Sequence, residues 1–171
     1  MRKLMIIAML LVLPAALFAQ LQVGGTALYN FPYLADSETE ADELSAADFT
    51  FGVDARLKIL LFQGSALALF TPGAEDVPGN IDLYLDGGVA FDILFFRLGL
   101  GAGPNFRIPV GEGETTGFGL NVKATADVML GDLAVGLSYL NKFELDFDQA
   151  GELLDQDYTQ GLLGVSVLVT M

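Results

Sequence analysis

The sequence has neither cysteine nor histidine at any of its 171 positions. Without cysteine the chain forms no disulfide, offers no thiolate and has no N-terminal cysteine for lipidation. Without histidine it builds no Ser-His-Asp triad, no Cys-His pair and no histidine-bound metal site. We therefore expect no catalytic residues, no metal site and no cofactor, and we predict that the protein is not an enzyme.

Basic residues and long apolar runs are also scarce. The chain has 8 Lys and Arg against 22 Asp and Glu, a net charge of -14, so nucleic acid would be repelled. Although 53% of the residues are hydrophobic, no apolar run after the N-terminal stretch approaches the roughly 18–20 residues that a membrane helix needs. The apolar residues therefore lie in shorter pieces, which favours β-strands.

The N-terminus has the layout of a secretory signal peptide. Two basic residues precede the apolar run of residues 4–13, and Ala19 stands at the expected cleavage point. An uncleaved membrane anchor is the alternative, but the run is short and Pro14 follows it directly. We predict a cleaved signal peptide over residues 1–19 and one exported domain over residues 20–171.

The exported domain divides into eight segments in which hydrophobic and polar residues alternate, separated by clusters of Gly, Pro, Asn and acidic residues. The clearest alternation sets Phe51 and Val53 against Gly52 and Asp54. Only a strand places residues i and i+2 on the same side. The segments are residues 20–31, 48–61, 65–70, 80–90, 94–103, 117–129, 132–140 and 158–171.

The connections between these segments alternate in length. Long connections cover residues 32–47, 71–79, 104–116 and 141–157, and short ones cover residues 62–64, 91–93 and 130–131. Four long loops and three short turns are the layout of an up-and-down barrel with both chain ends at the short-turn end. We therefore predict an all-β fold, an eight-stranded antiparallel up-and-down barrel.

The two faces of the strands differ, and the difference indicates which face is inside. One face is nearly free of charge, whereas the other combines Gly and Thr with charged residues. A soluble, lipocalin-like barrel would turn the apolar face inward, and a transmembrane barrel turns it towards lipid. The polar face suits a narrow lumen if its charges pair, since buried charges need partners; solvated surface pairs are the alternative. We predict a transmembrane β-barrel whose lumen charge network consists of Asp54, Arg56, Lys58, Asp82, Asp86, Arg97, Lys123 and Asp127.

With this set of segments, connections and faces, the chain resembles the small outer-membrane barrels of the OmpA-domain and OmpX type. The resemblance covers residues 20–171 and depends on layout rather than on one motif. It implies a bacterial outer-membrane location, contact with outer-membrane lipids and the barrel-assembly machinery, and a monomer. Such barrels usually end in an aromatic residue that the assembly machinery reads, whereas this chain ends in Met171.

Acidic residues gather in the long connections, for example in residues 36–43. Their spacing does not match an EF-hand loop, so we expect a solvated surface that contacts divalent cations loosely or host surface molecules. We predict a non-enzymatic outer-membrane protein with a structural or surface-interaction role. Two alternatives stay open: a narrow channel for ions or small hydrophobic molecules, similar to OmpW-like barrels, and a soluble ligand-binding barrel.

Overall fold

The structure, a computed structural model, describes residues 19–31, 49–73, 79–110, 117–144 and 161–171. Apart from Ala19, the predicted signal peptide lies outside the described residues, and so do the acidic runs of the long connections. Among the residues that are described, no helix is long and apolar enough to cross a membrane.

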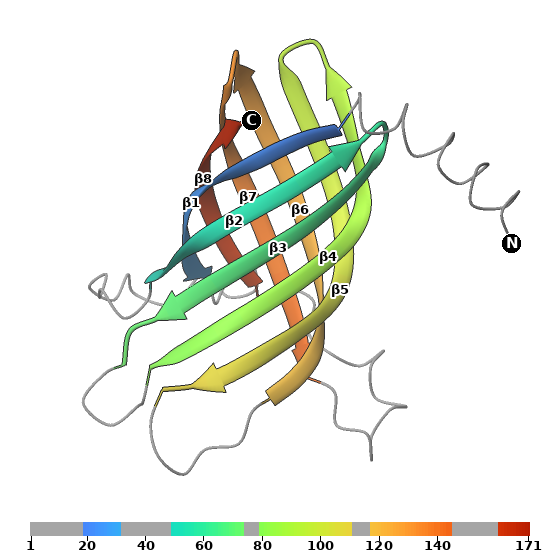
Figure 1. The fold of residues 1–171 in the computed structure, drawn as a ribbon. Helices are drawn as coiled ribbons and strands as arrows, with labels where there is room; N and C mark the ends of the chain where they lie inside the picture. Colours follow the sequence, from blue (N-terminus) through green and yellow to red (C-terminus); the bar gives the residue numbers. More distant parts are fainter. Residues whose placement is uncertain (1–18, 32–48, 74–78, 111–116, 145–160) are drawn as a thin grey trace, which may run out of the picture.

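Eight antiparallel strands form one closed barrel, in which each strand pairs with its neighbours in sequence and the last pairs with the first (Figure 1). The strands are β1 (Ala19–Phe31), β2 (Phe49–Ile59), β3 (Phe62–Thr71), β4 (Asn80–Ile93), β5 (Phe96–Pro109), β6 (Gly117–Leu130), β7 (Leu133–Glu144) and β8 (Gly161–Thr170). The connections β2–β3, β4–β5 and β6–β7 share one end of the barrel with the start of β1 and the C-terminus. We call this the short-turn end and the opposite one the long-loop end. The predicted all-β, eight-stranded up-and-down barrel is confirmed.

Successive side chains on each strand point alternately out of the barrel and into it, as the period of two requires. On β2, Phe51 and Val53 are 50% and 55% exposed, whereas Asp54 and Arg56 are each 1% exposed. The apolar face is therefore outside and the charged face inside.

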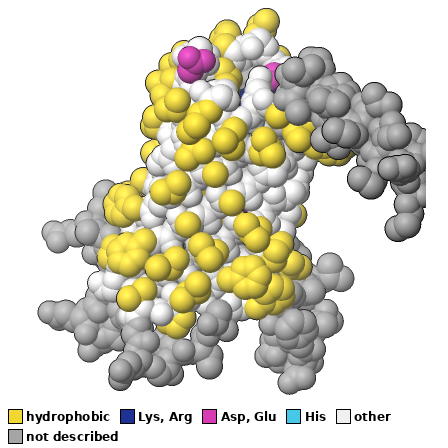
Figure 2. All heavy atoms as spheres, in the orientation of Figure 1, with side chains coloured by type: hydrophobic (Ala, Val, Ile, Leu, Met, Phe, Trp, Pro, Cys, Tyr) yellow, Lys and Arg dark blue, Asp and Glu magenta, His cyan; other side chains and the backbone are white. Residues whose placement is uncertain are grey.

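Hydrophobic side chains cover the outer wall on all eight strands. One exposed example from each strand in turn is Leu21, Phe51, Phe70, Leu85, Leu100, Leu120, Leu137 and Val165. In Figure 2 hydrophobic side chains extend over the whole visible wall, and acidic ones are seen only at the upper, short-turn end. Pairs of aromatic rings stand at both ends of this wall, with centroids 5.3 Å apart for Tyr29 and Phe49 and 4.3 Å apart for Phe95 and Phe96.

The short turns have two residues each, and two of the three are not where the residue types predict them. They are Leu60 and Leu61, then Leu94 and Phe95, then Gly131 and Asp132. The turns predicted at residues 62–64 and 91–93 are wrong, because Gly64 and Asp92 lie within strands although their residue types are typical of turns. Two of the true turns contain no turn-forming residue at all, so the sequence gives no local signal for them.

Strand β5 is longer than the sequence predicts. The prediction ended the strand at Gly103, since Pro104 cannot donate a backbone hydrogen bond. The strand in fact continues to Pro109, and Pro104 pairs with Leu120 of β6. The long connection predicted from residue 104 onwards is therefore wrong in its first part, and this brings one more basic residue, Arg107, into the barrel wall.

Candidate functional site: the charged lumen

The inner wall carries all eight residues that the sequence predicts for the lumen. Their exposed fractions range from 1% for Asp54, Arg56 and Asp127 to 9% for Lys58. Because the strands alternate strictly, parity along each strand decides this placement. The charges pair in three layers, which we call the short-turn layer, the central layer and the long-loop layer.

Arg56 organises the central layer. Its guanidinium lies 2.8 Å from Asp54 Oδ2 and 2.8 Å from Asp127 Oδ2, and Nη2 also donates to Ser166 Oγ at 3.2 Å. Asp54 forms a second ion pair, with Lys123, whose Nζ lies 3.0 Å from Oδ2. The four charged side chains are exposed by 3% or less. Breaking such a buried pair by removing one partner costs about 3–5 kcal/mol, since it leaves an uncompensated charge.

Asp86 joins the central layer through hydrogen bonds. It accepts one from Ser65 Oγ at 2.8 Å and another from Asn121 Nδ2. Ser65 Oγ in turn accepts a hydrogen bond from Lys123 Nζ at 3.4 Å, so the carboxylate and the ammonium share one hydroxyl. Beside Ser65, Asp86 and Lys123 is a cavity of about 10 Å³, which is room for about one water molecule.

The short-turn layer is built around Asp92, which the prediction missed by assigning it to a turn. Lys58 Nζ lies 2.7 Å from Oδ2, and Arg97 Nε lies 2.6 Å from Oδ1. Arg97 also donates to the side-chain oxygens of Gln22 at 3.0 Å and Gln20 at 2.5 Å. The Asp92 side chain is 39% exposed, so this layer closes the lumen at its mouth rather than deep inside.

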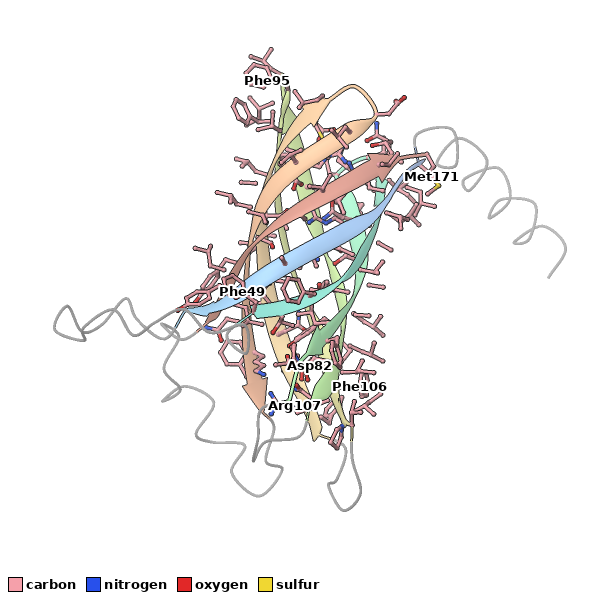
Figure 3. The ribbon with its side chains drawn as sticks, turned by 90° about the vertical axis from the view of Figure 1, so that its left-hand side faces the viewer. Phe49, Asp82, Phe95, Phe106, Arg107 and Met171 are labelled. Carbon is pink, nitrogen blue, oxygen red and sulfur yellow. The ribbon has the colours of Figure 1, made fainter. Side chains whose placement is uncertain are left out.

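The long-loop layer is built around Asp82 and brings in two cations that the prediction left out. Arg107 Nε lies 3.2 Å from Oδ1, and Lys142 Nζ lies 3.7 Å from Oδ2. Tyr84 donates its hydroxyl hydrogen to Oδ2 at 3.4 Å. Figure 3 shows Asp82 and Arg107 close together near the long-loop end. Every Lys and Arg of the described residues is thus ion-paired with an Asp inside the barrel.

An apolar cluster fills the lumen between the central and long-loop layers. Its members are Leu28, Leu67, Leu69, Tyr84 and Leu140, each exposed by 3% or less, with Leu162 packed against them. The order of residues on β4 fixes the position of the cluster, because Tyr84 lies between Asp82 of the long-loop layer and Asp86 of the central layer. We call these six residues the apolar plug. The sequence does not predict the plug, because on β3 both faces are apolar and alternation carries no signal there.

Comparison of the chain with protein-family models, curated proteins and solved structures found no match.

No group of three or more metal-binding side chains comes together within the described part of the chain. The acids are instead neutralised by Arg and Lys, with Asp54 shared between Arg56 and Lys123. Paired charges and the apolar plug therefore follow one another along the lumen.

Proposed function

We propose that this protein spans a bacterial outer membrane and serves there as a closed structural scaffold that presents acidic loops at the cell surface. The observation that carries this proposal is the inverted polarity of the barrel. Asp54 and Arg56 are each 1% exposed inside, whereas Phe51 and Leu100 are 50% and 57% exposed outside. In water such a wall would far exceed the apolar patches of about 300–600 Å² that monomeric soluble proteins tolerate. This argues against the soluble ligand-binding alternative.

The interior supports a scaffold rather than a pore. An eight-stranded barrel is just wide enough for side chains to fill its interior. An ion crossing this lumen would have to separate Arg56 from Asp127 and then displace the apolar plug, so two barriers lie in series. A non-enzymatic role agrees with the absence of Cys and His from the sequence.

The rest of the proposal follows from the sequence. The predicted signal peptide over residues 1–19 would export the chain, and the barrel-assembly machinery would insert it as a monomer among outer-membrane lipids. The connections that remain between the strands at the long-loop end, residues 32–48, 72–79, 110–116 and 145–160, contain no Lys or Arg and most of the acidic residues. Such loops would contact divalent cations or host surface molecules, because anionic groups at a surface attract cations.

Fractionation and electrophoresis test the membrane location. The protein should sediment with the outer membrane, dissolve only in detergent, and run at different positions on a gel with and without boiling. Boiling unfolds a closed membrane barrel that resists the detergent when cold. Recovery of the protein from the soluble periplasm without detergent would refute the proposal.

A channel for small hydrophobic molecules is the second candidate, favoured by one observation. The wall has a hollow of about 340 Å³. It is lined by Val53, Ala66, Leu67, Ala68, Leu83, Tyr84, Leu85 and Phe106. Two of these lining residues, Leu67 and Tyr84, belong to the apolar plug. In planar bilayers the scaffold proposal expects no conductance from the wild-type protein. Discrete steps of current, or uptake of a hydrophobic solute that Ala68→Leu abolishes, would favour the channel.

A further inference from the structure

Two of the three short turns hold a leucine in a backbone conformation that leucine rarely adopts. Leu60 and Leu94 each have a φ of 57°, and the equivalent first residue of the third turn, Gly131, has a φ of 69°. The left-handed region strains a residue with a large side chain, whereas glycine enters it freely. The chain thus keeps leucine at two positions whose backbone suits glycine. A strained position of this kind calls for a functional explanation.

The side chains at these two turns are apolar and stand out from the barrel. Leu94 is 91% exposed, Phe62 71% and Leu60 58%. Figure 3 shows Phe95 at the outermost point of the short-turn end. Neither turn contains a charged residue, whereas the third contains Asp132. The two apolar turns are therefore chemically different from the third.

The next strand along the chain after each hairpin holds the backbone of its turn in place. The carbonyl of the second turn residue accepts a backbone hydrogen bond in all three cases. The pairs are Ala90 N to Leu61 O at 2.8 Å, Met129 N to Phe95 O at 2.7 Å, and Thr170 N to Asp132 O at 2.7 Å. Because these bonds hold the backbone of the tip, the tip cannot fold back to cover its own side chains.

The apolar wall continues into the tips without interruption. On β5 every outward side chain from Phe96 to Ile108 is apolar. Phe96 is 44% exposed and Ile108 is 41% exposed. With a rise of about 3.3 Å per residue and a strand tilt of about 40°, that stretch covers roughly 30 Å of height, the thickness of a bilayer's hydrocarbon core. The tip beyond Phe96 therefore reaches the boundary of the same hydrocarbon layer on the short-turn side.

We propose that the tips of the β2–β3 and β4–β5 hairpins, residues 59–62 and 93–96, insert into the phospholipid bilayer at its inner interface, whereas the third tip at Asp132 contacts water. This inference rests on the membrane-spanning function proposed above. Lipid is the occupant that fits, because the tips continue a wall of the same apolar chemistry. Two four-residue tips are also far smaller than the 20–30 residues per side of a stable protein interface.

Single-cysteine variants test this directly, because the chain has no cysteine of its own. Leu94→Cys and Leu61→Cys place a spin label on the two tips, Asp132→Cys places one on the third turn, and Leu98→Cys places one on the wall. The full mature chain is reconstituted in liposomes of phosphatidylethanolamine and phosphatidylglycerol. Collision rates are then measured with oxygen, which concentrates in lipid, and with a neutral nickel chelate, which stays in water.

Labels at positions 94 and 61 should show a several-fold higher ratio of oxygen to nickel collisions than the label at position 132. If position 94 is as accessible to nickel as position 132 while position 98 stays in lipid, this inference fails and the membrane-spanning proposal stands. If position 98 is itself accessible to nickel, the membrane-spanning proposal fails. A partner protein in place of lipid would leave both tips open to nickel in these liposomes, which would also overturn the inference.

Discussion

Arg56 and Asp127 pair across the interior of the barrel, with 2.8 Å between Nη1 and Oδ2, from strands β2 and β6 on opposite sides of the ring. Both side chains are exposed by 1% or less. Backbone hydrogen bonds connect each strand only to its two neighbours, so this ion pair joins parts of the wall that the ladder leaves far apart. The lumen charges thus brace the barrel from within.

The ion pair between Arg56 and Asp127 should contribute most of the stability that the lumen charges give the barrel. Asp127→Ala leaves the buried Arg56 with one partner fewer, and we expect a loss of about 3–5 kcal/mol in the free energy of unfolding. Urea unfolding in liposomes, followed by circular dichroism, measures the loss. Lys142→Ala is the matched control, because that side chain is 35% exposed and 3.7 Å from Asp82; it should cost no more than about 1 kcal/mol. Equal losses would contradict the layered interior.

Leucines inside and outside the barrel should respond differently to truncation. Leu67→Ala empties part of the apolar plug and should lower the free energy of unfolding by about 2–5 kcal/mol. Leu100→Ala on the wall leaves no cavity, because lipid refills the space. It should lower the free energy of unfolding clearly less than Leu67→Ala does. The Leu67→Ala variant should still carry no current in planar bilayers, since the central charges remain in series with the plug. A conducting Leu67→Ala variant would show that the plug is the only barrier.

Two adjacent glycines give the sharpest test of side-chain orientation. A Cβ added at Gly24 would lie 1.9 Å from the carbonyl oxygen of Val167, whereas one added at Gly25 meets nothing within 4 Å. Gly24→Ala should therefore force the β1–β8 seam apart and impair folding. Gly25→Ala should be neutral or stabilise the barrel by up to about 1 kcal/mol, because it restricts the unfolded chain. The two variants are compared by the folded fraction on unboiled gels, and a reversed order would contradict the register of β1.

Replacing the strained leucine should reveal the environment of its turn. Asparagine tolerates a positive φ better than leucine, so in water Leu94→Asn would stabilise the barrel. If the tip lies in lipid, the lost burial of leucine, about 1.5–3 kcal/mol, exceeds the strain relieved. We therefore expect a net loss of roughly 1 kcal/mol in liposomes by urea unfolding. Gly131→Asn is the control and should change stability by no more than about 0.5 kcal/mol. A gain from Leu94→Asn would place that turn in water.

The sequence predicts the barrel well because two periodic signals agree. Alternation with a period of two sets which residues share a face, and the alternation of long and short connections sets the strand count. Parity alone then places Asp54, Arg56 and Lys123 on the inner face. The ends of the strands are harder to predict. Leu60 and Leu94 are not residue types typical of turns, and Pro104 wrongly indicates the end of a strand that continues to Pro109.

The details of the lumen depend on geometry that the pattern does not contain. Arg107 and Asp92 were missed because each lay beyond a predicted strand end. Which cation meets which acid depends on how far each strand is shifted against the next around the ring, and local sequence does not encode that shift. The plug residues Leu67 and Leu69 were missed because neighbouring outward residues are apolar as well.

The pairing of every described cation inside the barrel has a consequence for experiments on intact cells. Trypsin cleaves after Lys and Arg, and those of residues 20–171 are Arg56, Lys58, Arg97, Arg107, Lys123 and Lys142, all within strands. The connections at the long-loop end offer trypsin no site, whereas a protease that cleaves after glutamate finds several there. Shaving cells with trypsin would therefore leave the protein whole even if its loops stand fully outside. An amine-reactive surface label would find only the Lys142 side chain at that end, which is 35% exposed.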